Sequence, residues 1–341
     1  MKTYVLGAGA SAHVGYPLTA TLGADLLGWM KKQTKFDLYA PTAARLETTF
    51  NSTSNLEDLL TEMADAVSAG LADSDDETAI RQRFRQDYHV LGLALQERFA
   101  EIGKNPAGAY EQFCADVVQD GDCIITFNYD VSLERELRKA GKWDVGDGYG
   151  FAIGDHGEKS PVRVLKLHGS CNWLGSLWQS PGYGLGWRPV ISDWDMSLLG
   201  YPSERDPDFR NARSGIVPAL ILPTPAKRFF LALGNQQELG AFFGDLWSQA
   251  RYALRQSAHV VICGYSLPDA DERARELLLE KSISKSAEIS VVSGSTSEDI
   301  AERFRNHGYP HANAAGKVRF EDWARSDQFS AAPFPIARAL H

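Results

Sequence analysis

The residues of this chain that are best suited to chemistry stand directly after short apolar segments. His168 follows the apolar segment Val162–Leu167 and is itself followed by a glycine. An imidazole titrates near neutral pH, so a histidine that faces a cleft can serve as a general base. A histidine in this position can equally do no more than hydrogen-bond a backbone carbonyl, and the residue alone leaves both interpretations open.

Two polar residues, Asn128 and Asp130, follow a second apolar segment, Cys123–Thr126. The side chain between them points to the other side of an extended chain, so the amide and the carboxylate could face one polar ligand together. Asp130 or Ser132 could instead only begin the next helix, because both residue types are favoured at helix N-termini. A ligand site and a plain helix start therefore both stay open.

A glycine turn follows the first apolar segment, Thr3–Leu6. It has the sequence Gly-Ala-Gly-Ala-Ser over residues 7–11, a variant of the dinucleotide-binding pattern G-x-G-x-x-A. Glycines at this place let the backbone approach a phosphate, and the following helix would direct its unpaired N–H groups at that phosphate. The same glycines could also serve only the geometry of a tight strand–helix connection.

Two further segments, His259–Cys263 and Glu288–Val292, are followed by small and hydroxyl residues. Gly264, Ser266 and Ser293 are of the types that suit contacts with ribose and phosphate. Such residues are also common in ordinary strand–helix loops.

These side chains can meet only if one sheet brings them together, and the apolar segments predict such a sheet. The segments expected to form strands are Thr3–Leu6, Cys123–Thr126, Val162–Leu167, Ala219–Leu222, His259–Cys263 and Glu288–Val292. Most are continuous apolar runs, which is typical of parallel strands covered by helices on both faces. In open α/β sheets ligands bind at the carboxyl ends of the strands, so the polar residues above are expected to meet at one edge.

Two long stretches interrupt this strand pattern. Residues 19–115 carry apolar residues at helical spacing in Thr19–Lys32, Asn55–Val67 and Asp76–Phe99, which predicts an inserted helical module. Residues 176–214 are rich in Gly, Pro, Trp and Asp, and they predict a long irregular loop, such as a lid or a partner surface.

Composition limits the classes of protein to which the chain can belong. Its 341 residues are 44% hydrophobic and 23% charged, as in an ordinary globular protein, and the net charge of −9 argues against general affinity for nucleic acid. We expect no targeting signal and no membrane span. The cysteines are Cys114, Cys123, Cys171 and Cys263. None has C-x-x-C spacing, so we expect no zinc site, reduced core thiols and a cytoplasmic location.

Five short motifs occur in a specific order along the chain. They are G-A-G-A-S (7–11), F-N-Y-D (127–130), K-L-H-G-S (166–170), G-Y-S-L-P-D (264–269) and V-S-G-S (292–295). Together they resemble the sirtuin-like domains of bacteria, the branch often found in anti-phage defence proteins. The resemblance spans Met1 to about Gly294. It implies a single Rossmann-like domain over residues 1–335 that takes NAD+ as its substrate and cleaves the nicotinamide–ribose bond.

The resemblance also implies roles for individual residues. Asn128 would order the ribose and an attacking water, His168 would activate a ribose hydroxyl or the water, and Asp130 would hold the nicotinamide carboxamide. The implied NAD-binding residues are Gly7, Ala8, Gly9, Ser11, Asp130, Gly264, Ser266 and Ser293. No metal is expected in this site.

Three departures separate the chain from the protein-deacetylating sirtuins. The four-cysteine zinc module is missing, Phe127 stands where a glutamine is expected, and Tyr16–Thr19 stands where an arginine is expected. These departures favour hydrolysis of NAD+ to nicotinamide and ADP-ribose over deacylation, in the setting of anti-phage, abortive-infection defence. A defence hydrolase must stay silent until triggered. We therefore expect control by homo-oligomerisation or by a partner, such as a helicase/ATPase or a nucleic-acid-guided protein.

Three alternatives stay open at this point. They are an NAD-dependent deacylase or ADP-ribosyltransferase, a Rossmann dehydrogenase, and a non-catalytic nucleotide-binding assembly subunit. The dehydrogenase is disfavoured because residues 26–35, where its second strand and acidic residue should lie, have a helical pattern. The presence of both Asn128 and His168 counts against the non-catalytic subunit.

Overall fold

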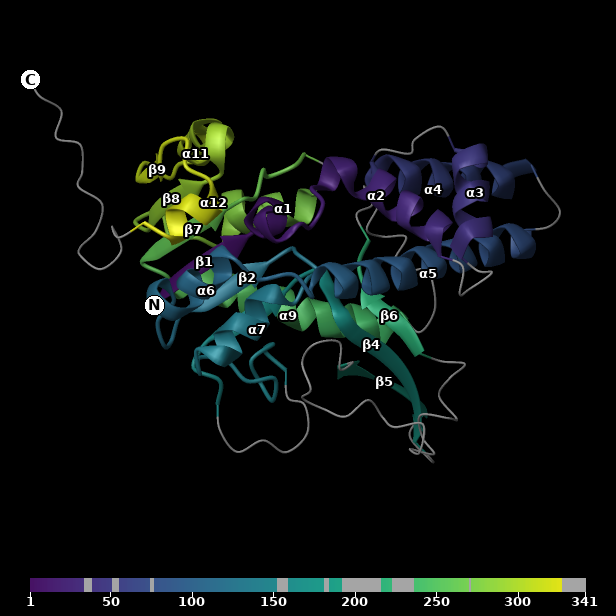
Figure 1. Ribbon diagram of the computed structural model, residues 1–341, viewed down its shortest axis with the longest axis horizontal. Helices are drawn as coiled ribbons and strands as arrows, with labels where there is room; N and C mark the ends of the chain where they lie inside the picture. The colour runs from purple at the N-terminus through teal and green to yellow at the C-terminus, as the bar shows by residue number, and fades with distance from the viewer. Residues whose placement is uncertain are drawn as a thin grey trace, which may run out of the picture.

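The computed structural model of the chain describes residues 1–33, 39–50, 55–73, 77–151, 159–180, 184–191, 216–222, 236–269 and 271–326. At its centre is a six-stranded sheet with the strand order β3-β2-β1-β7-β8-β9, in which all neighbours run parallel (Figure 1). The strands are β1 (Lys2–Leu6), β2 (Cys123–Thr126), β3 (Arg163–Lys166), β7 (His259–Cys263), β8 (Glu288–Val292) and β9 (Ala312–Ala314). This sheet confirms the predicted α/β fold of Rossmann-like type.

Burial on both faces explains why the strands of this sheet could be predicted. Val5 of β1 lies between Ile125 of β2 and Ile262 of β7, and all three side chains are fully buried. A continuous apolar run is what a doubly covered strand needs. The edge strand β9 has the sequence Ala-Asn-Ala, which carries no strand signal and is absent from the sequence prediction.

Helices cover both faces of the sheet because the crossovers leave its centre in two directions. The helices around the sheet are α1 (Ala8–Ser11), α6 (Ala109–Gln112), α7 (Ser132–Lys139), α9 (Gln236–Gln256), α10 (Glu272–Arg275), α11 (Ser297–Asn306) and α12 (Phe320–Ala324). α6 and α7 lead towards β2 and β3, whereas α10 and α11 lead towards β8 and β9. Right-handed crossovers that run in opposite directions place their helices on opposite faces.

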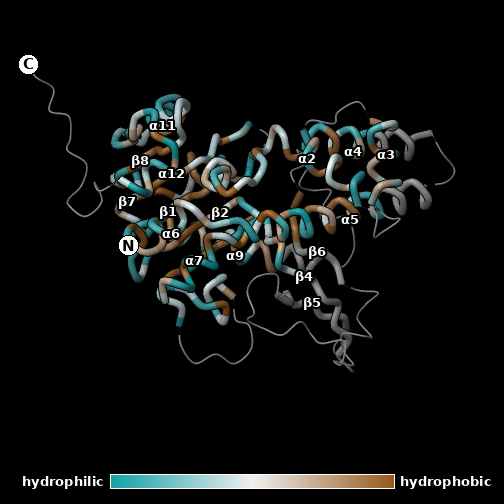
Figure 2. Tube along the Cα trace, in the orientation of Figure 1, coloured by the Kyte–Doolittle hydropathy of each residue, from teal (hydrophilic) through white to brown (hydrophobic). Residues whose placement is uncertain are grey.

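The chain between β1 and β2 forms the predicted helical module. Its helices are α2 (Thr19–Lys32), α3 (Tyr39–Thr49), α4 (Leu56–Asp73) and α5 (Glu77–Ile102). They lie together to one side of the sheet (Figure 1), and α2 and α4 show hydrophobic and hydrophilic turns in alternation (Figure 2). Gly23 lets α4 begin directly on α2, since a Cβ there would lie 2.7 Å from the backbone nitrogen of Leu56.

The prediction of an irregular loop over residues 176–214 is wrong in its first part. This region belongs to a three-stranded antiparallel sheet of order β5-β4-β6. Its strands are β4 (Gly169–Ser180), β5 (Gly184–Ile191) and β6 (Ile216–Leu220). Glycine and proline weaken a local strand signal, but pairing between strands overrides it, as where Gly175 pairs with Pro189. Residues 181–183 and 192–214 of the predicted loop lie outside the described residues.

The second sheet also corrects the position of one predicted strand. The segment Ala219–Leu222 overlaps β6, which pairs with β4 in the antiparallel sheet and not with the parallel strands. The apolar residues of this segment predict a strand, but they do not specify which sheet the strand joins.

All four cysteines are buried and free. Burial raises the pKa of the Cys123 thiol to about 12, so this core thiol stays protonated at neutral pH. In the part of the chain that the structure describes, no cluster of three or more His, Cys, Asp or Glu side chains is arranged to hold a metal ion. Of the helices in the described ranges, none combines the length and the apolarity that a membrane crossing requires.

His259, at the start of β7, makes the stability of the sheet sensitive to acid. Its Nε2 lies 2.9 Å from Ser290 Oγ, and burial, with a smaller contribution from Lys2, lowers its pKa below 6.5. The unfolded chain therefore takes up a proton at a higher pH than the folded chain, so stability falls as the pH drops through about 6.5. Between pH 7.5 and pH 5.5, we expect the melting temperature of His259→Gln to fall by less than that of the wild type, as measured by scanning calorimetry. The control is His311→Gln, which replaces an exposed histidine and should behave as the wild type. An equal fall in His259→Gln and the wild type would contradict the prediction.

Candidate active site

The order of the strands defines a crevice beside β1. From β1 the sheet extends through β2 and β3 on one side and through β7, β8 and β9 on the other. In such sheets the ligand crevice lies outside the carboxyl ends of the strands at this change of direction. A cavity of about 600 Å³ opens there, and all of the predicted site residues except Gly7 line it. These residues are Ala8, Gly9, Ser11, Asn128, Asp130, His168, Gly264, Ser266 and Ser293.

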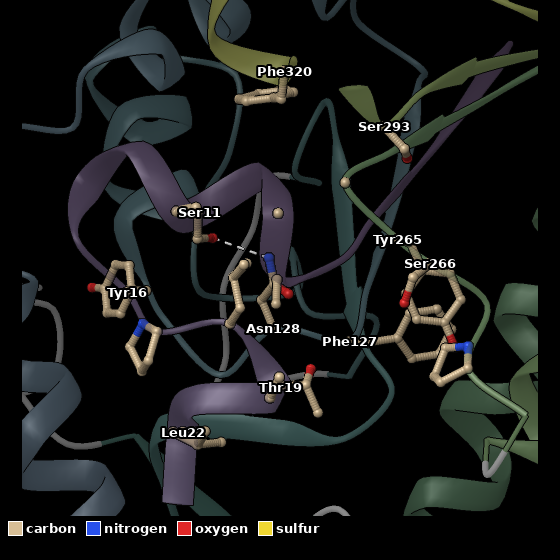
Figure 3. A pocket seen from close by; sticks show the side chains of 18 of the residues that line it. Ser11, Tyr16, Thr19, Leu22, Phe127, Asn128, Tyr265, Ser266, Ser293 and Phe320 are labelled. Carbon is tan, nitrogen blue, oxygen red and sulfur yellow. Dashed lines mark hydrogen bonds between the residues drawn. The ribbon is translucent and has the colours of Figure 1, made fainter. Parts of the chain in front are cut away.

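Asn128 lies in the middle of the cavity with its amide nitrogen held from two sides (Figure 3). Nδ2 donates to the Gly7 carbonyl at 2.9 Å and to Ser11 Oγ at 3.0 Å. Ser11 Oγ in turn donates to Asp130 Oδ2 at 2.6 Å and lies 2.8 Å from the Tyr110 hydroxyl. Within the described part of the chain Asn128 Oδ1 accepts no hydrogen bond, so this oxygen is available to a ligand in the cavity.

The glycines of the first turn serve a close contact between two turns of the backbone. The Gly7 and Gly9 N–H groups donate to carbonyls at the end of β7, at 3.0 and 2.9 Å. A Cβ on Gly7 would lie 2.6 Å from Tyr265 Cα, and one on Gly264, whose φ is +60°, would lie 2.2 Å from the first turn's backbone. Of the N–H groups at the start of the following helix, α1, that of Gly9 is therefore already used within the chain. The alternative interpretation, glycine required for geometry, holds at these positions.

Asp130 lies both at the cavity and at the start of α7. Its carboxylate lines the cavity, and its Oδ1 accepts a hydrogen bond from the N–H of Ser132, the first residue of α7, at 3.1 Å. Behind it, Lys166 Nζ donates to the Asp130 carbonyl and to Glu134 Oε1, the latter at 2.8 Å. Lys166 and Glu134 are fully buried, and burial raises the pKa of the Glu134 carboxyl although Lys166 opposes this. This buried ion pair supports the loop that carries Asn128.

His168 lies in the turn between β3 and β4 and is 8% exposed. Gly169, with φ +83°, lets the chain turn immediately after it. The imidazole packs against Phe127 with ring centroids 5.1 Å apart, and its Nε2 lies 3.5 Å from Asp271 Oδ2. Asn128 and His168 thus reach the same cavity from the ends of the neighbouring strands β2 and β3.

Phe127, which stands where the resemblance implies a glutamine, forms an aromatic wall of the cavity with Tyr265. The two rings stack with centroids 4.4 Å apart and an interplanar angle of 20° (Figure 3). Burial raises the pKa of the Tyr265 hydroxyl, and the nearby Asp271 adds to this effect. The hydroxyl therefore stays protonated and donates to Asp271 Oδ2 at 3.2 Å. This wall offers a flat apolar surface beside the polar groups of Asn128 and His168.

Another part of the cavity carries hydroxyl groups at the ends of β7 and β8. Ser293 Oγ is buried and has no hydrogen-bond partner in the part of the chain that the structure describes. Ser266 lies nearby on the loop after β7 and is exposed (Figure 3). A buried hydroxyl without a partner is costly, so Ser293 is suited to hydrogen-bond a ligand.

The cavity also contains residues that the sequence analysis did not single out. Asp271, Glu57, Arg319 and Phe320 line it. They come from the N-terminus of α10, the first turn of α4 and the start of α12. An aspartate before a helix is common in any sequence. The proximity of Asp271 to His168, in the turn after β3, therefore becomes visible only in the fold.

Comparison with known proteins gives a likeness among solved structures. No family model and no curated protein matches the sequence. Among solved structures, the chain is similar to one described as "Structural Basis for the Mechanism and Regulation of Sir2 Enzymes". The similarity has 15% sequence identity and a TM-score of 0.34, and it covers 86% of this chain and 80% of that chain.

Proposed function

We propose that this protein hydrolyses NAD+ at the nicotinamide–ribose bond, giving nicotinamide and ADP-ribose. The observation that carries the proposal is the meeting of Asn128 and His168 in one cavity at the carboxyl ends of the parallel strands. Asn128 presents a carbonyl oxygen fixed by its own amide hydrogen bonds, and His168 presents an imidazole 8% exposed. One group can orient a hydroxyl or a water, and the other can accept its proton.

The remaining lining residues fit a dinucleotide. The cavity volume of about 600 Å³ is in the range of small-molecule and cofactor sites. The unpartnered hydroxyl of Ser293, together with Ser266, supplies hydrogen bonds of the kind that a ribose or a phosphate takes. The wall of Phe127 and Tyr265 supplies an apolar surface for a planar ring. The roles of the individual NAD-binding residues remain part of this proposal.

The reaction requires a polar, ordered site more than a strong acid. The C1′–N bond breaks with its electron pair leaving on neutral nicotinamide, a water oxygen adds to C1′, and the water's proton is lost. The ribose passes through a cation, which fixed dipoles can stabilise. In this proposal Asn128 Oδ1 accepts a hydrogen bond from the ribose or the water, and His168 takes the proton. Asp130 and Ser11 keep Asn128 in place.

The test is NAD+ consumption by the full chain, with nicotinamide and ADP-ribose separated by chromatography. We expect both products in equal amounts, and a loss of turnover of about 10²–10⁴-fold in His168→Ala if the imidazole is the general base. The assay is repeated with an acyl-lysine peptide and with extract of infected cells. O-acyl-ADP-ribose as the main product would contradict hydrolysis in favour of deacylation. NAD+ binding by calorimetry without turnover in either condition would favour a non-catalytic subunit.

The cellular setting of the proposal comes from the sequence resemblance alone. We propose that the chain depletes NAD+ during phage infection and is activated by self-association or by a partner protein. Infection of cells that carry the wild type or His168→Ala tests this part. Equal plaque numbers in the two strains would contradict a defence role and leave the enzymatic proposal standing.

A further inference from the structure

A carboxylate outside the predicted set lies against the imidazole of the site. Asp271 is 7% exposed and lines the same cavity as His168. Its Oδ2 lies 3.5 Å from His168 Nε2, and it accepts a hydrogen bond from the Tyr265 hydroxyl at 3.2 Å. Its other oxygen, Oδ1, accepts from the N–H of Ala274 in α10 at 3.3 Å. The carboxylate is therefore anchored at one oxygen and directed at the imidazole with the other.

In this arrangement His168 is the base, and the fixed carboxylate of Asp271 lies beside it in a position to orient its ring. The bond from Ala274 N–H fixes Asp271 as the N-cap of α10, so the carboxylate cannot turn away without uncapping the helix. Tyr265 keeps its proton and can only donate to Asp271. A carboxylate beside one ring nitrogen favours the proton on that nitrogen and stabilises the imidazolium. The same relation orients the base in known nucleophile–base–carboxylate arrangements.

The other groups around His168 are mainly aromatic. Phe127, Tyr129 and Trp247 pack around its ring at centroid distances of 5.1, 6.5 and 6.4 Å. Charged side chains on the packing elements include Glu57 of α4, which lines the cavity, and Arg273 of α10, whose Cζ lies 4.3 Å from the centre of Trp247. Arg251 of α9, the helix that carries Trp247, repels Arg273. An apolar cage of this kind penalises a charged imidazole. A carboxylate within the cage offsets that penalty.

We propose that Asp271 is a positioning residue that orients His168 and stabilises the imidazolium formed when His168 takes the proton of the attacking water. The proposal rests on the proposed function for the identity of the reaction. The proton moves from the water to the imidazole as the water oxygen bonds to C1′, and the Asp271 carboxylate stays ionised throughout. Asp271 itself does not touch the reacting atoms in this assignment.

The experiment compares Asp271→Asn with Asp269→Asn. Asp269 is the matched control, because it lies on the same loop, is 82% exposed and pairs with Arg303 on the surface. The first readout is an NMR titration of the ¹⁵N-labelled histidines, with His168 assigned through His168→Gln. Loss of a carboxylate at this distance should lower the pKa of His168 by about 1 unit or more. Asp269→Asn should leave the titration as in the wild type.

The second readout is the pH profile of kcat/KM for NAD+ cleavage. We expect its acidic limb to move to lower pH in Asp271→Asn, together with a fall in kcat of at least about tenfold. Asp271→Ser, which keeps a favoured helix cap without the carboxylate, covers the case in which the asparagine variant does not fold. An unchanged His168 titration in a folded variant would overturn the proposal. A changed titration, with no NAD+ turnover by the wild type even in extract of infected cells, would uphold the pairing and reject the proposed function.

Discussion

Replacing Asn128 with alanine is expected to lower NAD+ hydrolysis by about 10²–10³-fold, the usual effect of removing one preorganised polar group from an active site. The amide nitrogen is fixed by Gly7 and Ser11, so the orientation of Oδ1 is set before any ligand binds. Alanine removes the oxygen that would order the ribose or the water. The effect should fall on kcat more than on KM, because the oxygen acts on the reacting end of the substrate only.

Two further variants separate this chemical role from a structural one. Asn105→Ala is the matched control, since Asn105 also donates from Nδ2 to a backbone carbonyl, that of Val14 at 3.0 Å, but lies outside the cavity lining. Asn128→Asp keeps the size of the side chain and removes the amide donors. Turnover in Asn128→Ala within about threefold of the wild type would exclude a catalytic role for this residue. A fall that matches a loss of folded protein, measured by thermal unfolding, would make its role structural.

The shared cavity of Asn128 and His168 could be predicted from the strands that precede them, whereas the position of Asp271 beside His168 could not. Asn128 and His168 follow apolar segments that become the neighbouring strands β2 and β3, so their meeting is a consequence of parallel pairing. No apolar strand segment directly precedes Asp271, so its sequence position does not place it at the cavity. It precedes a helix of four residues, and its relation to His168 depends on how α10 packs against the turn after β3.

The glycines of the first turn and Gly264 have the predicted position, but the structure gives a different reason for their being glycine. The first turn and Gly264 do lie at the cavity, as the sequence predicts. The N–H groups of Gly7 and Gly9 are nevertheless used on carbonyls after β7, and the missing Cβ atoms make room for that contact. Local sequence shows that a turn requires glycine. It does not show whether the space is filled by a ligand or by another part of the chain.

The antiparallel sheet was the largest part of the fold that the sequence did not predict. β4 continues from the turn after His168, and its pairing with β5 and β6 depends on segments distant in sequence. Glycine and proline within these strands suppress the period-two pattern on which strand prediction depends. The parallel strands β1, β2, β7 and β8 are buried and carry their apolar signal within four or five residues, so the sequence predicts them.

Replacing Lys166 with methionine is expected to cost about 3–5 kcal/mol of unfolding free energy, measured by urea denaturation at pH 7.5. The Lys166–Glu134 pair is fully buried, and Lys166 also donates to the carbonyl of Asp130. Methionine fills a similar volume, but it leaves the Glu134 carboxylate without its cation in the interior. Glu134 Oε2 has no hydrogen-bond partner within the described residues, and Oε1 would keep only the hydroxyl of Tyr149 among the side chains that contact it.

A matched control and a double variant distinguish this charge effect from simple loss of packing. Lys139 is 64% exposed, and its partner Glu136 also contacts Arg135 Nε at 3.4 Å, so Lys139→Met should change stability by less than about 1 kcal/mol. Combining Lys166→Met with Glu134→Leu should recover much of the loss, because no buried charge is then left alone.

Burial raises the pKa of Glu134, so in Lys166→Met the folded state binds a proton that the unfolded chain does not. The deficit of the single variant should therefore shrink as the pH falls from 7.5 towards 5. The loss of unfolding free energy could instead be independent of pH and persist in the double variant. In that case it would come from altered packing around Asp130 and not from the buried charge.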